Sequence, residues 1–310
     1  MTKVGFIGLG AMGLPMAKRI VAAGYPVCTT FHKSRRPADE LASLGATVAD
    51  TPAEVARQSE VVITILPADA EVDEVALGSG GLIEGLSAGA ILIEMTSASP
   101  ASVRRLEAEL RPSGCRVLDA PVSGGTTGAA RGTLTIMAGG DPSLLEECRP
   151  LLSCMGSRIV HVGAVGQGKV VKMINQMLAA LHLVAIGEAF ALGVKCGADP
   201  GTLYQVIKDS SGYSKVMDLR LPGFLLEGSF EPGFKLSLMK KDVDIALQEA
   251  LDAGVPLLLG STTAQLLAAT VAAGHADADY SVAAQFIADW TGARLAKPPA
   301  GDAVPAGGSA

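Results

Sequence analysis

The chain has 310 residues, a length that predicts one domain of about 150 residues followed by a second. The composition is 49% hydrophobic with a formal net charge of −6, so it offers neither the basic clusters that nucleic acid requires nor the roughly 18 uninterrupted apolar residues of a membrane span. The five cysteines are scattered and the N-terminus lacks a secretory pattern, so we expect a cytoplasmic protein. The cysteines form no C-x-x-C pair and the four histidines are widely spaced, so we expect no metal site.

Short apolar, β-branched runs alternate with helix-compatible stretches through residue 162, the pattern of a parallel sheet covered by helices. A helix is expected over Ser99–Leu110, and the rhythm of the later strands loosens, which predicts that the sheet gains mixed strands. The predicted strands are Val4–Ile7, Val27–Phe31, Val61–Leu66, Ile91–Met95, Arg116–Asp119, Leu134–Ala138 and Ile159–Val162.

A glycine-rich turn follows the first strand directly and opens a helix from about Leu14 to Ala23. With 37 glycines in the chain the motif alone is a weak signal, but this context aims backbone N–H groups at a pyrophosphate and predicts a dinucleotide site. A glycine turn that serves only chain geometry is the alternative. The residues that match G-x-G-x-x-G are Gly8, Leu9, Gly10, Ala11, Met12 and Gly13.

The second strand ends in a basic turn. Phe31 occupies the position where an Asp that binds the ribose of NAD is expected, and His32, Lys33, Ser34 and Arg35 follow it. Cations at this position suit a 2′-phosphate, so we expect NADP(H) as the favoured cofactor and NAD(H) as the other possibility. A solvated basic turn that takes no part in cofactor choice is the alternative.

A second glycine-rich segment, residues 163–168, marks the predicted domain boundary. The first domain would cover residues 1–162 and the second, helical in period, residues 163–296. The second begins with one long helix over Lys169–Lys195, expected to be buried on most of its surface because apolar residues occupy every side. Breaks are expected near Pro200, Pro222 and Pro232. Residues 297–310, rich in Pro, Gly and Ala, are expected to form a disordered tail.

Four blocks, in order and well separated, carry a resemblance to a known family. They are the glycine turn at residues 5–13, Asp-Ala-Pro-Val-Ser-Gly-Gly at 119–125, Gly-Gln-Gly-Lys-Val-Val-Lys-Met-Ile-Asn at 166–175, and Lys-Lys-Asp at 240–242. The chain resembles the β-hydroxyacid dehydrogenase family, which includes 3-hydroxyisobutyrate dehydrogenase, tartronate semialdehyde reductase and 2-(hydroxymethyl)glutarate dehydrogenase.

The resemblance covers nearly the whole chain and implies both a fold and an activity. The fold would be a Rossmann-like α/β N-terminal domain, a long interdomain helix and an all-α C-terminal domain, with the active site between the domains. The activity would be hydride exchange between NAD(P) and a small β-hydroxy acid or its semialdehyde, carried out by a homo-oligomer, a dimer or tetramer.

Lys172 matches the family's catalytic lysine. Oxidation of a carbinol requires loss of the hydroxyl proton, so a proton acceptor is needed, and lysine titrates near 10.4 unless it is desolvated or lies near other positive charge. The apolar neighbours Val171, Met173 and Ile174 suggest such desolvation. Lys169, one turn earlier, is expected to be solvated.

The resemblance places further residues around the substrate. Asn175 and Gln176 lie within one turn of Lys172, and we expect Asn175 to hold the substrate hydroxyl, with Gln176 as the alternative. Ser123, with the backbone of Gly124 and Gly125, resembles the family's carboxylate cradle, against the alternative of a plain glycine turn.

Other positions match segments that flank the cofactor or the substrate pocket. The cofactor-binding candidates are Leu66, Pro67, Thr96, Ser97, Lys241 and Asp242. Phe234 resembles a wall of the substrate pocket, although a buried core aromatic is an equally simple interpretation.

Three other functions compete with hydroxy-acid dehydrogenation. An oxidative decarboxylase of the 6-phosphogluconate type would need a His-Asn pair after its lysine, where this chain has Ile174 and Asn175. A non-catalytic nucleotide-binding protein would be expected to lack Lys172. The carboxylate cradle around Ser123 argues against an imine-reducing relative. Segments typical of different branches of the family conflict, so the sequence leaves the acid itself open.

Overall fold

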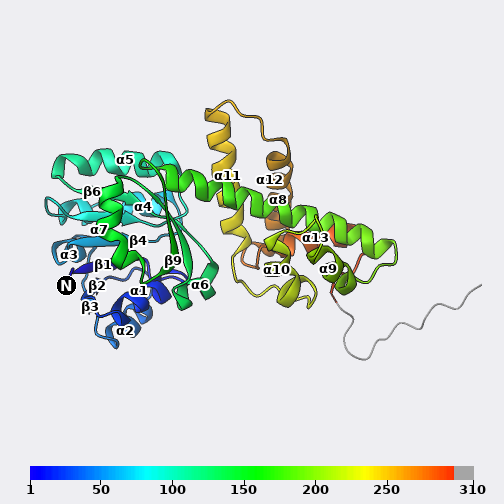
Figure 1. Ribbon diagram of the computed structural model, residues 1–310, viewed down its shortest axis with the longest axis horizontal. Helices are drawn as coiled ribbons and strands as arrows, with labels where there is room; N and C mark the ends of the chain where they lie inside the picture. Colours follow the sequence, from blue (N-terminus) through cyan, green and yellow to red (C-terminus); the bar gives the residue numbers. More distant parts are fainter. Residues whose placement is uncertain (297–310) are drawn as a thin grey trace, which may run out of the picture. The chain divides into compact units, whose positions relative to one another are not determined.

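The structure, a computed structural model, describes residues 1–296, so the tail predicted over 297–310 lies outside the described residues. The chain divides into two compact units, Met1–Asn175 and a second that begins at Gln176 (Figure 1). This division falls within helix α8 (Gln167–Lys195), whereas the sequence predicted a boundary at the glycine-rich turn just before that helix.

The first unit is built on a nine-stranded sheet. Its strands are β1 (Val4–Ile7), β2 (Val27–Thr29), β3 (Thr47–Val48), β4 (Val61–Thr64), β5 (Ile91–Glu94), β6 (Arg116–Asp119), β7 (Val122–Ser123), β8 (Leu134–Gly139) and β9 (Gly156–Gly163). The order is β3-β2-β1-β4-β5-β6-β8-β7, with β9 beside β8. The first six strands are parallel, and β8 runs antiparallel to both β6 and β7, which confirms the predicted mixed strands.

The direction of winding reverses between β1 and β4. From β1 the chain proceeds to β2 and β3 on one side, and from β4 to β5 and β6 on the other. In open parallel sheets, ligands bind outside the carboxyl ends of the strands at such a reversal. The turns after β1, β2, β4 and β5 therefore lie at the edge where the sequence places the cofactor.

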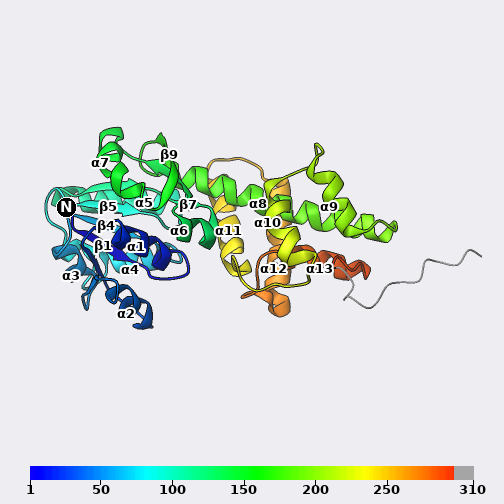
Figure 2. The same ribbon diagram turned by 60° about the horizontal axis from the view of Figure 1, so that its bottom comes forward.

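Helices cover both faces of this sheet (Figures 1 and 2). One apolar core is formed with α1, α2, α6 and α7, and residues such as Met16 and Leu152 belong to it. A second core, with Val55 and Leu106, joins α3, α4 and α5 to the opposite face. The helices are α1 (Gly13–Ala22), α2 (Arg36–Ala42), α3 (Pro52–Arg57), α4 (Asp69–Leu77), α5 (Pro100–Leu110), α6 (Gly125–Arg131) and α7 (Pro142–Leu152).

The regular elements of the second unit are helices throughout the part that the structure describes, joined by loops and one isolated bridge between Lys235 and Asp279. It contains the later turns of α8, α9 (Pro200–Lys208), α10 (Lys215–Arg220), α11 (Leu236–Asp252), α12 (Leu258–Thr270) and α13 (Val282–Thr291). The predicted breaks are confirmed: the Asp199 side chain caps α9, and Pro222 and Gly223 leave helical geometry with ψ of 138° and φ of +76°. Leu183, Phe190 and other apolar residues form its own core.

Helix α8 is less covered than the sequence predicted. Leu183, Ile186 and Phe190 are buried, but Ile174, Leu178 and Leu192 are 44%, 44% and 66% exposed, so the expectation of burial on most of the surface is wrong. The helical wheel showed apolar residues on every side without showing which sides have neighbours within the chain. By length and composition alone α8 is also apolar enough to cross a membrane.

Candidate active site

The glycine turn after β1 has the geometry of a phosphate cradle. Gly8 has φ of +102°, and a Cβ there would lie 2.0 Å from the carbonyl oxygen of Ile65. A Cβ on Gly13 would lie 1.7 Å from the carbonyl oxygen of Gly8. Only glycine fits these two positions, which close the turn against its neighbours.

Gly10 differs from these two glycines. A Cβ at Gly10 would meet no atom within 4 Å, so the packing of the chain itself does not require glycine there. The adjoining helix α1 starts at Gly13, and its N-cap residue Met12 makes no side-chain capping hydrogen bond. Open space beside a helix N-terminus suits the close approach of a pyrophosphate, so the residues fit a dinucleotide.

The basic turn after β2 is solvent-facing. His32, Lys33, Ser34 and Arg35 are all exposed. The Nε of Arg35 lies 3.1 Å from Oδ1 of Asp39, and its guanidinium lies 5.0 Å from the ring centroid of Phe31. Part of the positive charge of this turn is therefore compensated within the chain by an exposed ion pair.

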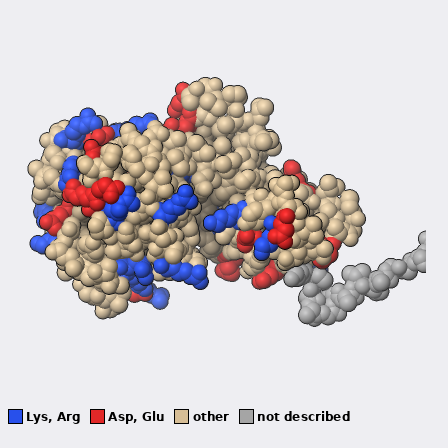
Figure 3. All heavy atoms as spheres, in the orientation of Figure 1, with Lys and Arg blue, Asp and Glu red and all other residues tan. Residues whose placement is uncertain are grey.

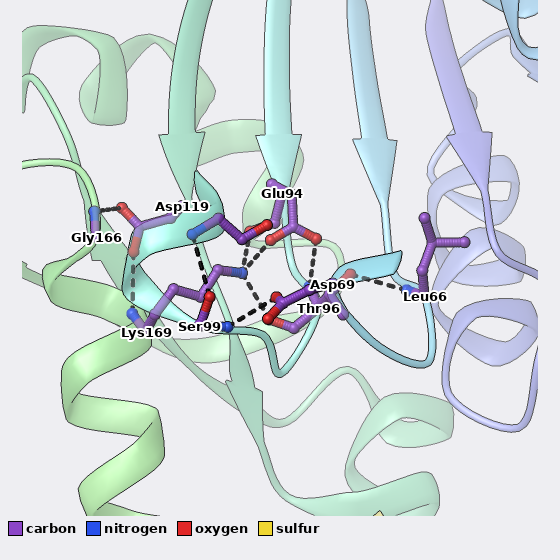
Figure 4. Close-up of polar contacts among 9 residues, drawn as sticks. Leu66, Asp69, Glu94, Thr96, Ser99, Asp119, Gly166 and Lys169 are labelled. Atoms are coloured by element: carbon purple, nitrogen blue, oxygen red, sulfur yellow. Dashed lines mark hydrogen bonds and ion pairs between the residues drawn. The ribbon is translucent and has the colours of Figure 1, made fainter. Parts of the chain in front are cut away.

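The loops after β4 and β5 are hydrogen-bonded to each other. Thr96 is fully buried, and its Oγ1 accepts a 2.9 Å hydrogen bond from the backbone N–H of Leu66. Ser99 donates its backbone N–H to Asp69 Oδ1 at 2.9 Å, which joins the same two loops a second time (Figure 4). Leu66, Pro67, Thr96 and Ser97, which the sequence placed beside the nicotinamide, thus belong to one connected pair of loops.

Lys169 is not solvated, contrary to the sequence-based expectation. Its side chain is 0% exposed and forms an ion pair with Glu94 Oε2 (Figure 4). Its Nζ also donates to the carbonyl oxygens of Thr96, at 2.6 Å, and Glu94, at 3.1 Å. The expectation failed because the first turn of α8 docks on the ends of β5 and β6, which the sequence did not reveal.

Asp119, at the end of β6, receives the start of α8. Its Oδ1 accepts a 2.8 Å hydrogen bond from the N–H of Gly166, and its Oδ2 accepts one of 3.0 Å from the N–H of Lys169. Burial raises the pKa of this carboxyl, while these hydrogen bonds and the Lys169 charge lower it in part.

Sequence reasoning missed this network, although a signal for it exists. Glu94 and Asp119 each end an apolar run, and they are direct partners in the parallel register of β5 and β6. Burying a carboxylate without a partner is unfavourable, so two carboxylates at the ends of buried strands indicate a buried cation or several N–H donors nearby. A search for that partner among the nearby lysines would have pointed to Lys169.

Lys172 lies one helical turn after Lys169 and on the same face of α8, because residues three apart on a helix are neighbours. It is 8% exposed. Val171 and Ile174 are 37% and 44% exposed, so these sequence neighbours are not what shields it. Adjacent residues on a helix point away from one another, which is why the apolar neighbours in the sequence were a poor guide.

The two amides after Lys172 have different surroundings. Asn175 is exposed, whereas Gln176 is 8% exposed and its Nε2 donates to Asp242 Oδ2 at 2.8 Å. Asp242 is itself buried and lies 3.1 Å, through Oδ1, from Nζ of Lys241. In the second unit, Gln176 thus joins α8 to the predicted lysine and aspartate pair on α11.

The predicted carboxylate cradle lies between β7 and α6. Ser123 is half-buried and pairs with Thr135 of β8, and the next two residues are glycines with φ of +137° at Gly124 and +63° at Gly125. A Cβ on Gly125 would meet no atom within 4 Å. The serine is thus followed directly by two glycines, the second of which borders open space.

Phe234 packs in the second unit. Its ring lies edge-on to Tyr280 with centroids 6.0 Å apart, and its N–H donates to Asp279 Oδ2 at 2.9 Å. The half-buried ring packs against the core of that unit. This agrees with the core interpretation, and its role as a pocket wall stays a prediction.

Two family profiles of known proteins match the chain, and together they span most of both units. The family profile described as NAD binding domain of 6-phosphogluconate dehydrogenase matches residues 3–163. A second profile, described as NAD-binding of NADP-dependent 3-hydroxyisobutyrate dehydrogenase, matches residues 166–287. Helix α8 therefore lies entirely within the second matched domain.

Individual relatives agree with these profiles. The chain is 36% identical over 290 residues to 2-(hydroxymethyl)glutarate dehydrogenase of Eubacterium barkeri, covering 94% of this chain and 96% of the relative. Mitochondrial 3-hydroxyisobutyrate dehydrogenase of Mus musculus is also 36% identical, with coverages of 92% and 87%. The solved structure of 3-hydroxyisobutyrate dehydrogenase from Mycobacterium tuberculosis with L-serine has a TM-score of 0.84 and 34% identity, covering 93% of this chain and 99% of that one.

The relatives cover both units at more than 30% identity, and the matched profiles describe both. The resemblance found in the sequence and the predicted Rossmann-like and helical domains are thereby confirmed. The chain belongs to the β-hydroxyacid dehydrogenase family and is a nicotinamide-dependent oxidoreductase that exchanges hydride with a small hydroxy acid.

Proposed function

We propose that the chain interconverts a small β-hydroxy acid and its semialdehyde, with Lys172 as general acid–base and NADP(H) as the favoured cofactor. The observation that carries the proposal is the position of Lys172. A buried lysine lies one turn into a helix that docks on the carboxyl ends of β5 and β6, next to the loops predicted to flank the nicotinamide.

The reaction requires a hydride and a proton to leave the substrate together. A bound nicotinamide supplies the hydride acceptor, or the donor in the reverse direction. In oxidation, the Lys172 amine accepts the hydroxyl proton while the carbinol C–H electrons leave as hydride and the C=O bond forms. In reduction, the Lys172 ammonium returns that proton to the carbonyl oxygen.

Other residues would hold the acid in place. Asn175, exposed on α8 three residues after Lys172, is our candidate for the hydrogen bond to the substrate hydroxyl. The Ser123 hydroxyl and the N–H groups of Gly124 and Gly125 would receive the carboxylate. Gln176, whose Nε2 donates to Asp242, is the alternative.

The cofactor preference rests on the basic turn after β2. Lys33, Ser34 and Arg35 are exposed, and a 2′-phosphate bound beside them would accept charge-assisted hydrogen bonds, which supports NADP(H). The ion pair between Arg35 and Asp39 reduces this advantage without removing it, because exposed pairs are worth about 1 kcal/mol or less. Lys241 and Asp242 are retained as cofactor candidates from the second unit.

We also propose a cytoplasmic homo-oligomer, a dimer or tetramer, without a metal ion or a nucleic-acid partner. All five cysteines lie among the described residues and are free, as in a reducing compartment. Leu251, Leu258 and Leu259 are 73–80% exposed, which favours association of the second unit. On the face drawn in Figure 3, basic side chains lie among acidic ones, and this mixture of charges supports the proposal that nucleic acid is not a partner.

The test is a spectrophotometric screen at about 340 nm, where the reduced nicotinamide absorbs. NAD(H) and NADP(H) would each be combined with 3-hydroxyisobutyrate, 2-(hydroxymethyl)glutarate, L-serine and tartronate semialdehyde. We expect turnover with at least one acid or semialdehyde and a higher kcat/KM with NADP(H). Cofactor binding without turnover of any of them, or turnover of cyclic imines alone, would contradict the proposal.

A further inference from the structure

One ion pair is buried on both sides within the described residues. Lys169 and Glu94 are 0% and 1% exposed, whereas the chemically similar pair of Lys18 and Glu40 is 35% and 46% exposed. Removing two charges from water costs more than many such pairs regain, so a buried pair is a poor device for stability alone. The burial of this pair therefore suggests a role beyond stability.

The contacts of Lys169 fix its ammonium group completely. The three N–H donors of a lysine match three acceptors here: Glu94 Oε2, the Glu94 carbonyl and the Thr96 carbonyl. The other oxygen of the Glu94 carboxylate, Oε1, accepts a 2.8 Å hydrogen bond from the N–H of Thr96. The ion pair therefore holds the loop after β5 by both its backbone and its side chains.

Lys169 also anchors the start of α8, the helix that carries Lys172. The N–H of Lys169 is bonded to Asp119, and Lys172 follows three residues later on the same face of α8. Thr96 in turn accepts the N–H of Leu66 from the loop after β4. The Lys169 side chain thus connects the helix that carries Lys172 to the loop after β5, and Thr96 extends this connection to the loop after β4 (Figure 4).

We propose that Lys169 is a positioning residue, which through its ion pair with Glu94 sets the Lys172 amine relative to the Thr96 and Ser97 loop. This inference rests on the proposed role of Lys172. A displacement of about 1 Å at the reacting groups can reduce turnover by about 100-fold, so such a connection bears directly on kcat. The contacts of Lys169 are with Glu94, Thr96 and Asp119 rather than with the Ser123 turn, so we expect the acid to bind at that turn with little change.

The test replaces the pair by a neutral one of similar shape, Lys169→Met with Glu94→Gln. The glutamine keeps an Oε1 acceptor for the Thr96 N–H, and the methionine fills the apolar volume of the lysine stem. The matched control, Lys18→Met with Glu40→Gln, removes a surface ion pair of the same two residue types from the same unit. Both double variants and the wild type are assayed well below their melting temperatures.

We expect the buried double variant to lose at least about tenfold in kcat, with the KM for the acid within a few-fold of wild type. The control should keep both constants. Wild-type kcat in a folded buried double variant would overturn the proposal, because a purely structural pair can be replaced without effect on turnover.

Glu94→Asp provides a second variant should the double variant not fold. It keeps both charges but withdraws the carboxylate by one methylene, so kcat should fall while the KM for the acid is retained. An unchanged kcat would overturn the proposal. If the wild type oxidises no acid, the proposed function fails separately. The positioning is then tested by acetylation of the Lys172 amine, measured by mass spectrometry relative to acetylation of the exposed Lys33. Equal relative acetylation rates of Lys172 in the wild type and in Glu94→Asp would refute the positioning role.

Discussion

Substitution of Gly10 by alanine separates the fold of the glycine turn from its function. A Cβ on Gly10 meets no protein atom within 4 Å, and its φ lies outside the left-handed region, so the turn accepts the methyl group. Replacing glycine by alanine at a compatible position stabilises a protein by about 0.4–1 kcal/mol, because the unfolded chain loses freedom. We therefore expect Gly10→Ala to unfold at or slightly above the wild-type temperature.

The methyl group should instead be felt by the cofactor. If a pyrophosphate packs against the backbone at Gly10, the methyl occupies its space and weakens charge-assisted hydrogen bonds worth about 1.5–3 kcal/mol each. One such loss corresponds to roughly a 10- to 100-fold rise in Kd. Gly13→Ala is the contrasting change, because its Cβ would lie 1.7 Å from the Gly8 carbonyl oxygen and should destabilise the fold itself.

The assay is titration with NADPH, followed by its fluorescence, beside thermal unfolding of the same variants. Weak cofactor binding in a Gly10→Ala protein that melts like wild type would support the cradle. Wild-type affinity in that variant would refute the assignment of Gly10 and favour a glycine turn that serves only chain geometry.

Three further predictions address separate parts of the chain. Burial raises the pKa of Cys148 to about 12, so iodoacetamide at about pH 8 should modify the exposed Cys196 and spare Cys148 in the native protein. Equal labelling of the two cysteines, measured by peptide mass spectrometry, would contradict the burial of Cys148. Ser123→Ala should raise KM for the acid with little change in kcat, and steady-state kinetics with an unchanged KM would remove Ser123 from the cradle. Lys33→Glu with Arg35→Glu should lower kcat/KM for NADP(H) more than for NAD(H), and equal losses would show that the basic turn is only a solvated surface.

Much of the first unit follows from local patterns in the sequence. The strand at Val4–Ile7 and the helix after Gly13 are visible because an apolar run and three glycines punctuate them sharply. β3 and β7 are two residues each, too short for an alternating pattern, and their place depends on pairing with β2 and β8. Periodicity cannot report such long-range pairing.

The site was predicted only in part, for a related reason. The position of Lys172 in the chain came from a motif, but the burial of Lys169 depends on the docking of α8 against Glu94 and Asp119, residues 75 and 50 positions away. On sequence alone, a lysine one turn before another is expected in water. The exposure of Ile174 and Leu178 was missed similarly, because a wheel does not show which neighbours exist.

Lys172→Ala tests most directly whether Lys172 moves the proton that accompanies hydride transfer. With the best acid from the spectrophotometric screen, kcat should fall by at least about 100-fold, since general acid–base assistance contributes that much. The Kd for NADPH should stay within a few-fold of wild type, and the circular dichroism spectrum should be unchanged. A variant that binds cofactor normally and turns over at nearly the wild-type rate would contradict the account.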